Sequence, residues 1–485
     1  MSDDSDLARR PRPNPSHTAP LRTAPLRTEL PAVGEHLDVA IDGVARDGRG
    51  TAEIAGRKLH VAGMLPGDRG WVRLTAVDRH GHGAHGVLVA LSERGHGRRD
   101  VACAAHEDNQ SQGCTGCPWL PWTPASQRLH LRTLLAGHGL HVDAVGWVGD
   151  GEDRTDDGAC GYRWSAKRVV FQDASGRLRL GSYRARSHHG AAMTGCLVDH
   201  PTVRAAADEL ERVAQSLRVP AWHGGRPGAR QLTERGGLRY VWLKTDGAQV
   251  LLTLITSGMA EVAVRALAEA LELPAGVAWS VQDGQGNSMR GDAPTQLRGL
   301  SALTVALCGV AVQAGPLGFL QPNPAVASRC YEALVQDEDD ATSGGVSSGA
   351  LALALDLYAG AGVTTALLRQ RFATVLPSES WPESAALLGI TAETTEVFLA
   401  RWVAQRRATP DLIIANPPRA GLRSAVTALL TTIGAPRLHI MSCSPQSLQA
   451  DLQALAPRYE LISLQAWATL PQTPHVELVA KLRLR

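Results

Sequence analysis

The sequence predicts an α/β protein whose C-terminal domain holds a mostly parallel sheet, preceded by a small β-barrel and a central α+β domain. Three observations support this fold class. Short alternating strands fill residues 34–91, strands alternate with helices after residue 350, and 485 residues suit about three domains of roughly 100–200 residues each. Because 44% of the residues are apolar and 20% are charged, a largely disordered chain is excluded.

The first two regions differ sharply in composition. Residues 1–33 are predicted to be a disordered tail, because prolines recur and few apolar residues could form a core. In residues 34–96, turns rich in Gly, Asp and Pro separate short strands, which is typical of an OB-like barrel. The expected strands are Leu37–Ile41, Ala52–Ile54, Leu59–Val61, Trp71–Leu74 and Gly86–Val89. Such barrels often bind nucleic acid, and a purely structural barrel is the alternative.

Overall charge and cysteine usage bound the cellular setting. With 49 basic and 47 acidic side chains, the chain is not a histone-like polycation. No apolar run approaches the roughly 18–20 residues of a membrane helix, so no membrane partner is expected. The polar start lacks an apolar leader and eight cysteines are unevenly spread, so we expect a cytoplasmic protein. No feature indicates an obligate protein partner.

Residues 97–312 are predicted to form a central nucleic-acid-binding domain, with packing of residues 118–145 on the C-terminal domain left open. Residues 162–186 carry seven basic side chains and one acid, Asp173, with aromatic residues between them. Guanidinium groups suit phosphates and aromatic rings stack on bases, so this hairpin predicts an RNA-facing surface. The alternative is an ordinary solvated hairpin whose aromatic side chains lie in the core.

Residues 313–485 are predicted to form the α/β domain. Its expected strands are Ala350–Leu357, Thr374–Leu376, Asp411–Ala415, Arg437–Met441, and a C-terminal pair, Glu460–Leu464 and Val476–Leu484. A helix is expected at Thr364–Arg371. Because ligands bind at the carboxyl ends of parallel strands, the motifs that follow these strands are the candidates for a site.

The first motif is a glycine loop. The first of these strands contains Asp356 and is followed by Gly360 and Gly362, which let a ligand approach the backbone at a helix start. Glu379 follows the next strand, where an acid commonly bonds ribose hydroxyls. Because the GxGxxG spacing is missing, the loop favours an S-adenosylmethionine site over a dinucleotide site.

Three further motifs lie near the same edge. Asn416 and Arg419 belong to a stiff Asn-Pro-Pro-Arg turn that borders the expected cleft. Cys443, in Ser-Cys-Ser-Pro, is a candidate nucleophile, with a buried structural cysteine as the alternative. Glu477, in Pro-Gln-Thr-Pro-His-Val-Glu, is a candidate general base that His475 could help to position, and each could instead be a surface residue.

These four motifs, in this order and together with Phe319-Leu-Gln-Pro-Asn323, resemble the RNA uracil-C5 methyltransferase family over residues 34–485. The resemblance implies a Rossmann-like S-adenosylmethionine methyltransferase domain that methylates C5 of a uridine in RNA. The barrel looks like the TRAM domain of some members. In the family, a TRAM domain together with a cysteine cluster is more typical of enzymes that act on 23S ribosomal RNA than of those that act on transfer RNA, so the resemblance implies ribosomal RNA as the partner.

The chemistry explains why a thiol and a carboxylate must converge. C5 of uracil is too weak a nucleophile to attack a methyl sulfonium until a thiolate adds to C6, and a base must then remove the C5 proton. The resemblance implies that Cys443 is the nucleophile and Glu477 the base. The target base must leave its stack to be reached. The resemblance implies that further residues contact the cofactor or this base: Gln321, Tyr358, Gly360, Glu379, Asn416 and, beside the flipped base, Phe319.

Four cysteines form a possible metal site. Cys103, Cys114 and Cys117 have the spacing C-x10-C-x2-C, and with a distant fourth thiol they suit either zinc or a four-iron cluster. The family resemblance implies a [4Fe-4S] cluster with Cys196 as fourth ligand and Cys160 as competitor. Such a cluster would be structural or RNA-orienting, and no metal at all is the alternative. Cys308 and Cys330 are expected to be plain core residues.

Three other functions are compatible with parts of this sequence. Asn416 replaces an Asp of many members, and Pro377 a usual small residue, so a catalytically inactive RNA-binding homologue is one alternative. The same reaction on transfer RNA is another. A radical S-adenosylmethionine enzyme is disfavoured, because the chain lacks the C-x3-C-x2-C pattern of that class and its α/β end would be unexplained.

Overall fold

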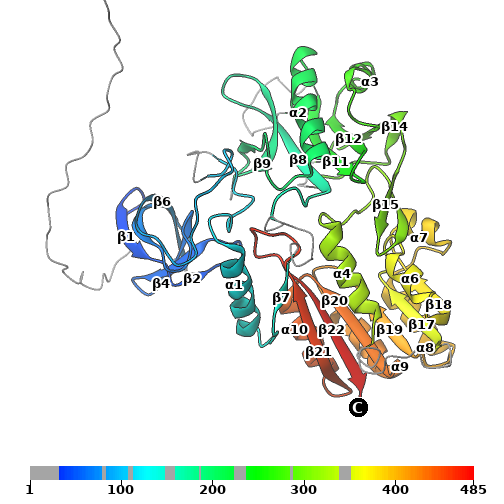
Figure 1. Cartoon of the computed structure of the whole chain (residues 1–485). Helices are drawn as coiled ribbons and strands as arrows, with labels where there is room; N and C mark the ends of the chain where they lie inside the picture. Colours follow the sequence, from blue (N-terminus) through cyan, green and yellow to red (C-terminus); the bar gives the residue numbers. More distant parts are fainter. Residues whose placement is uncertain are drawn as a thin grey trace, which may run out of the picture.

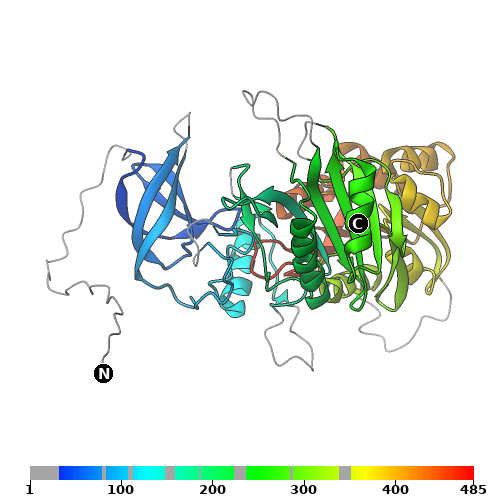
Figure 2. The same ribbon diagram turned by 90° about the horizontal axis from the view of Figure 1, so that it is seen from above.

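This computed structural model describes residues 32–485, except 79–82, 108–112, 148–158, 185–186, 223–235, 285–287 and 338–350. The expected tail therefore lies outside the described residues up to residue 31, as does Arg186 of the basic hairpin. The described strands form a six-stranded sheet, a seven-stranded sheet, a two-stranded hairpin and a second seven-stranded sheet (Figure 1). Seen from above, the six-stranded sheet (blue) lies at one end of the molecule and the yellow to gold segment of the C-terminal part lies at the other (Figure 2).

The N-terminal sheet has the strand order β1-β5-β6-β4-β3-β2. Its strands are β1 (His36–Ala40), β2 (Gly43–Val44), β3 (Gly50–Ile54), β4 (Arg57–Ala62), β5 (Arg69–Val77) and β6 (Gly83–Glu93). Side chains in β1 alternate between exposed and buried, as the period of a strand requires, and Leu37 and Val39 enter an apolar core with Leu59 and Val72. The five predicted strands overlap β1, β3, β4, β5 and β6, whereas the OB or TRAM assignment stays a prediction.

The central sheet has the order β10-β9-β8-β11-β12-β13-β14. Its elements are β8 (Ser165–Gln172), β9 (Leu178–Tyr183), β10 (Gly190–Ala192), α2 (Pro201–Ser216), β11 (Gly237–Thr245), β12 (Val250–Ser257), α3 (Glu261–Ala270), β13 (Gly276–Val281) and β14 (Thr295–Gly299). Helices α2 and α3 cover one face, where Leu210 and Leu267 share a core with Leu252. A smaller cluster on the other face holds Tyr240 and Trp242.

The basic hairpin forms where expected, and two of its basic side chains are paired with carboxylates of the protein. Arg168 is buried and paired with Asp199, and Arg179 pairs with both Asp173 and Glu211. Since α2 and the loop before it supply two of these carboxylates, both guanidinium groups are neutralised within the protein. Arg168 and Arg179 therefore do not present free charge to RNA.

A hairpin and a helix join the central part to the C-terminal sheet. The hairpin is β15 (Leu303–Leu307) and β16 (Val310–Ala314), and helix α4 (Pro324–Val335) follows. Asn323 caps α4 by accepting a hydrogen bond from the Val326 amide. The boundary predicted between residues 312 and 313 falls inside β16, and α4 packs on β20 and β22 of the C-terminal sheet.

The C-terminal sheet has the order β18-β17-β19-β20-β22-β21-β7. Strands β18 (Phe372–Ser378), β17 (Leu351–Leu357), β19 (Leu412–Ala415) and β20 (Arg437–Ser442) are parallel, while β22 (Glu477–Leu484) runs antiparallel between β20 and β21 (Tyr459–Trp467). The helices are α6 (Val363–Leu368), α7 (Pro382–Leu388), α8 (Thr395–Ala404), α9 (Arg423–Ile433) and α10 (Pro445–Leu455). Helix α6 ends at Leu368, three residues before the predicted end.

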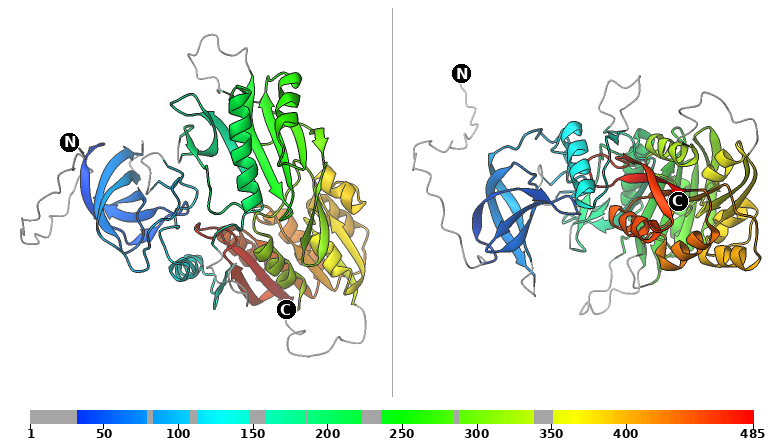
Figure 3. Two further views of the ribbon diagram at one scale, coloured as in Figure 1. Left: turned by 45° about the horizontal axis from the view of Figure 1, so that its top comes forward. Right: turned by 90° about the horizontal axis from the view of Figure 1, so that it is seen from below.

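An earlier segment completes this sheet. Strand β7 (Val145–Gly146) pairs in parallel with β21, and Leu131 and Leu135 of α1 (Pro124–Gly137) belong to the apolar core of the C-terminal sheet. In the view from below, α1 lies between the N-terminal sheet and the C-terminal strands (Figure 3). No helix among the described residues is long and apolar enough to cross a membrane.

Candidate active site at the carboxyl edge of the C-terminal sheet

Cys443 and Glu477 lie at the same edge of the sheet for a topological reason. Cys443 follows the carboxyl end of β20, and Glu477 begins β22, which runs in the opposite direction beside it. Ser442 is paired with Leu478, so the residues next to this pair are neighbours. The thiol and the carboxyl group therefore come together although 33 residues separate them in the sequence.

The electrostatics of this pair depend on Arg419. Burial raises the pKa of Glu477 to about 8, and the charge of Arg419 opposes that rise. Burial and the nearby Glu477 raise the pKa of Cys443, whereas the Arg419 guanidinium lowers it through its charge and a hydrogen bond. Arg419 is therefore the cation that favours both the thiolate and the carboxylate.

The predicted cofactor-binding side of the edge is built around Glu379. One oxygen of this carboxylate accepts a hydrogen bond from the Gly360 amide at 2.8 Å, and the other accepts from the Trp381 amide at 2.6 Å. Gly360 has φ +56°, and a Cβ placed there would meet no atom within 4 Å. The loop thus offers open space against its backbone, which is what a nucleoside ligand requires.

Asp356 stabilises the glycine loop through hydrogen bonds to the helix that follows it. The carboxylate is buried and accepts hydrogen bonds from the hydroxyl groups of Thr364 at 2.8 Å and Thr365 at 2.5 Å. Burial raises the pKa of Asp356 to about 6, and the two hydroxyl donors oppose the rise. Asp356 therefore ties the end of β17 to the first turn of α6.

The remaining predicted site residues flank this edge. Tyr358 has φ +60°, an unusual value for a residue with a side chain, and the backbone N–H of Asn416 donates to the Leu357 carbonyl at 3.2 Å. Gln321 donates from Nε2 to the Tyr331 hydroxyl at 3.1 Å. Glu477 raises the pKa of Tyr331 further after burial, so the Gln321 side chain lies on the Glu477 side of the edge.

The loop before Glu477 is held by residues from the other end of the chain. Tyr162 donates from its hydroxyl to the Pro471 carbonyl at 3.0 Å, and the Trp119 amide donates to the Gln472 carbonyl at 2.9 Å. Gln472 in turn donates from its amide to Gln127 Oε1 at 2.8 Å. The position of Glu477 therefore depends on residues 119–162.

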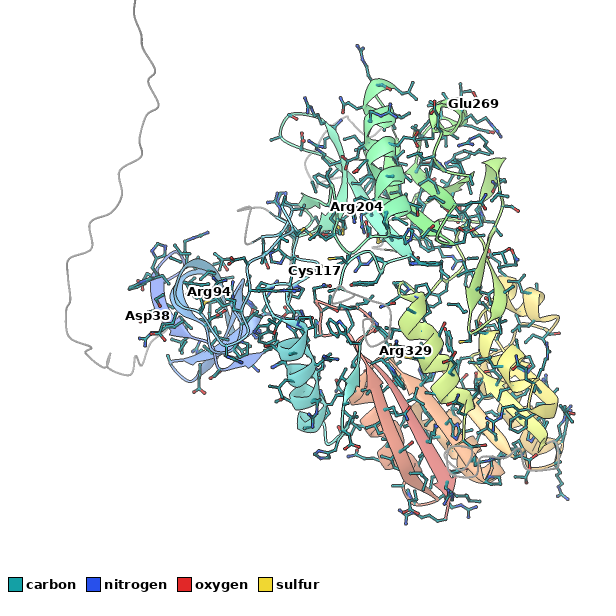
Figure 4. The ribbon with its side chains drawn as sticks, in the orientation of Figure 1. Asp38, Arg94, Cys117, Arg204, Glu269 and Arg329 are labelled. Atoms are coloured by element: carbon teal, nitrogen blue, oxygen red, sulfur yellow. The ribbon has the colours of Figure 1, made fainter. Side chains whose placement is uncertain are left out.

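The four cysteines predicted as metal ligands line one cavity together with Cys160 and Gln472. They are Cys103, Cys114, Cys117 and Cys196. Figure 4 places Cys117 where the N-terminal, central and C-terminal parts meet. Burial raises the pKa of Cys117, and Arg163 lowers it. The thiol donor set fits a soft metal or a cluster. Within the described ranges, however, no three His, Cys, Asp or Glu side chains are grouped closely enough to share one ion.

Comparisons with known proteins give the fold. The crystal structure of Pyrococcus abyssi tRNA (uracil-54, C5)-methyltransferase in complex with S-adenosyl-L-homocysteine matches with a TM-score of 0.66 at 20% identity, covering 92% of this chain and 100% of that chain. The chain has the fold of that methyltransferase. No protein-family model matches it.

Curated relatives extend over nearly the whole chain. An uncharacterized RNA methyltransferase of Thermosynechococcus vestitus is 28% identical over 471 residues, which cover 93% of this chain and 98% of the relative. Another, from Parasynechococcus marenigrum, is 26% identical over 479 residues, which cover 93% and 96%. The chain is thus similar to RNA methyltransferases from the N-terminal sheet to the C-terminal strands.

Several residues at the site were not found from the sequence. Trp381 and Tyr331 bond to predicted site residues, and Gln472 joins the Glu477 loop to the cysteine cavity. The position of Trp381, two residues after Glu379, was the only sequence signal for it. Tyr331 is one of several apolar-face residues of α4, and no local pattern distinguishes it.

Proposed function

We propose that this protein is an S-adenosylmethionine-dependent RNA (uracil-5-)-methyltransferase. The observation that carries the proposal is the convergence of Cys443, Glu477 and Arg419 at the edge that also carries the open glycine loop. The RNA methyltransferase relatives and the shared fold support the RNA substrate and the cofactor.

S-adenosylmethionine would supply an electrophilic methyl group at this edge. Gly360 and Glu379 would hold it on one side, and Tyr358, Asn416 and Gln321 border the space between it and the base. The carboxylate of Glu379 already bonds two backbone amides, so its orientation is fixed before a ribose hydroxyl arrives. These residues bind and orient the methyl donor and take no part in bond breaking.

Cys443 and Glu477 perform the chemistry on the base. The Cys443 thiolate forms a bond to C6, and the electrons of the C5–C6 double bond move toward O4. C5 would then take the methyl group and become tetrahedral, while the bond between that methyl group and the donor's sulfonium sulfur breaks and leaves a neutral thioether. Glu477 removes the C5 proton, the C5–C6 double bond re-forms and the bond from sulfur to C6 breaks. Arg419 favours the thiolate at the start and receives it again at the end.

The alternative function, a catalytically inactive RNA-binding homologue, was suggested by Pro377 and Asn416, and the position of Pro377 weakens the first argument. Pro377 lies in β18, which pairs only with β17 among the described strands, and an edge strand tolerates a residue without an amide hydrogen. Asn416 can donate and accept hydrogen bonds at the uracil edge. Binding of S-adenosylmethionine, measured by isothermal titration, separates the two functions, since absence of binding would favour the inactive homologue.

We further propose that the RNA is 23S ribosomal RNA rather than transfer RNA and that the enzyme is cytoplasmic. The fold neighbour is named for a transfer RNA position, so the two RNA classes must be tested together. Nucleoside mass spectrometry of both RNA pools from a deletion strain should show loss of 5-methyluridine from ribosomal RNA. Loss of 5-methyluridine from transfer RNA instead would identify transfer RNA as the substrate. Unchanged 5-methyluridine in both RNA pools would refute the proposed function.

We also propose that the cysteine cavity holds a [4Fe-4S] cluster with a structural role. Its support is that the four predicted ligand thiols line one space, together with Cys160, where three parts of the protein meet. Iron and sulfide content of protein purified without oxygen should fall when Cys117 or Cys196 is changed to serine, whereas zinc content without sulfide would favour a zinc site. Methyl transfer itself needs no electrons from this group.

The mechanism is tested with two variants and a control. Cys443→Ala should abolish methylation and covalent trapping of RNA, and Glu477→Gln should accumulate a denaturant-resistant protein–RNA adduct. Cys308→Ser is the matched control, because that thiol lies in the β15–β16 turn and donates to the Ser328 carbonyl. Methylation at the normal rate by Cys443→Ala would refute the nucleophile.

A further inference from the structure

Trp242 of β11 gathers two of the four lysines in the chain. The Lys167 ammonium lies 3.8 Å from the centroid of the indole ring, and the Lys244 ammonium lies 5.5 Å from it. Lys167 faces Trp242 across the β8–β11 pair. In a chain whose other basic residues are nearly all arginine, two ammonium groups therefore share one aromatic ring on the sheet face opposite α2 and α3.

The same indole fixes a third cation. Trp242 donates from Nε1 to the Met289 carbonyl at 3.0 Å, which holds the backbone next to Arg290. The Arg290 guanidinium lies 3.8 Å from the Trp381 ring and 3.9 Å from Glu383. Arg290 thus reaches from the central part to the segment just after Glu379, at the proposed cofactor side.

Lys244 clamps the loop that leads to Phe319. Its buried ammonium donates to three carbonyl oxygens, those of Gly315 at 2.5 Å, Pro316 at 3.0 Å and Gly318 at 2.5 Å. An ammonium has three protons, so no donor is left for a ligand. The next residue, Phe319, is 73% exposed although it is a large apolar side chain.

The cluster defined as Lys167, Trp242, Lys244 and Arg290 holds three basic side chains with one acid beside them. In the described part of the chain no carboxylate lies within ion-pair distance of Lys167 or Lys244, and the exposed Glu383 lies 3.9 Å from Arg290. Burial lowers the pKa of Lys244 to about 7, and the charges of Lys167 and Arg290 lower it further. Arg168 and Arg179 on the same hairpin as Lys167 are each paired, so the imbalance is local.

We propose that Lys167 and Arg290 form a binding site for a backbone phosphate of the RNA strand next to the target uridine, and that Lys244 is a positioning residue that holds Phe319 toward that strand. The proposal rests on the proposed function for the identity of the strand. Lys244 of this cluster bonds the Gly318 carbonyl beside Phe319, and Arg290 lies over the Trp381 ring, so the cluster joins the segments at the proposed target-base and cofactor sides of the edge. Aromatic rings beside a phosphate site suit an unstacked strand.

The phosphate contacts are tested by the salt dependence of binding. A short fluorescein-labelled oligouridine is titrated with the full chain at several KCl concentrations, and fluorescence anisotropy gives the affinity. Lys167→Ala and Arg290→Ala should each weaken binding at low salt and reduce the slope of log affinity against log salt, and the double variant should reduce that slope by about 0.7, the value per phosphate for single strands. Lys167→Arg should restore both quantities.

Arg265→Ala is the control, because Arg265 lies on α3 and pairs with Glu261 on its own helix. It should leave affinity and slope unchanged. Unchanged affinity and slope in Lys167→Ala and Arg290→Ala would overturn the phosphate site. Changed slopes without any 5-methyluridine product would keep the site and remove the proposed reaction, so the two failures are distinguishable.

A double-mutant cycle tests the positioning role of Lys244. Lys244→Gln and Phe319→Ala should each weaken oligouridine binding, and the double variant should be no weaker than the worse single variant. Coupling of this kind is expected when one residue acts through the other, whereas distant independent residues give additive losses. Additive losses would overturn the positioning role, and thermal denaturation of each variant checks that the chain is folded.

Discussion

Replacing Glu477 by glutamine should stop removal of the C5 proton while leaving formation of the thiol adduct intact. Glu477 sits beside Cys443 and Arg419, and burial raises its pKa to about 8. At pH 7 a carboxyl group with that pKa is ionised in about one tenth of molecules, and at pH 9 in about nine tenths. If Glu477 is the base, the rate of proton removal should therefore rise about tenfold between these pH values.

Tritium release from RNA labelled at C5 of uridine measures this step directly. Single-turnover reactions with the wild-type chain should show the rise, and Glu477→Gln should release little tritium while a denaturant-resistant adduct accumulates. Glu460→Gln, at an exposed position of β21, is the matched control and should behave as the wild type. Tritium release by Glu477→Gln at the wild-type rate, or a wild-type rate that does not change with pH, would refute the assignment of Glu477.

Three more predictions follow from the same contacts. Because the folded chain raises the pKa of Glu477 from 4.5 to about 8, the folded state binds more protons than the unfolded state in that range, and this group's contribution to stability falls as pH rises through it. Glu477→Gln should therefore melt at a higher temperature than the wild type above pH 8, with the gap closing toward pH 5. Arg419→Gln should raise the pKa of Cys443 and slow adduct formation at pH 7, with recovery at alkaline pH in quenched-flow trapping. Thr365→Val should destabilise the chain by roughly 1–3 kcal/mol in denaturant unfolding, because buried Asp356 loses a donor, whereas Thr432→Val at an exposed position of α9 should cost less.

The C-terminal sheet was predictable because its strands are short apolar runs that end in turn residues. The placement of Gly360, Glu379, Asn416 and Cys443 at one edge of the sheet followed from that pattern, since parallel strands bring their carboxyl ends to one edge. Strand β7 was not predictable, because two residues carry no periodic signal and pair only after β21 is in place.

The charge distribution was the less predictable part. The basic hairpin looked free because only Asp173 lies within it, yet Asp199 and Glu211 pair with Arg168 and Arg179 from 31 and 32 residues away. Sequence composition cannot show a partner that the fold delivers. Lys244 likewise has the pattern of an ordinary strand residue, and its three carbonyl partners, 71 to 74 residues away, give it its role.

The contacts that residues 119–162 make with the loop before Glu477, called here the brace, make the assembly of the active site depend on the order in which the parts fold. Gln472 contacts Gln127 and Ala159 across 345 and 313 residues of sequence, and Pro471 contacts Tyr162 across 309. Contacts so distant in sequence form late, because the entropy of closing the loop must be overcome before they stabilise anything. A C-terminal sheet that folds first would bring Cys443 into place while the loop before Glu477 still lacked its brace. The nascent chain would then be able to form the thiol adduct before it could resolve it, unless the earlier segment were already docked.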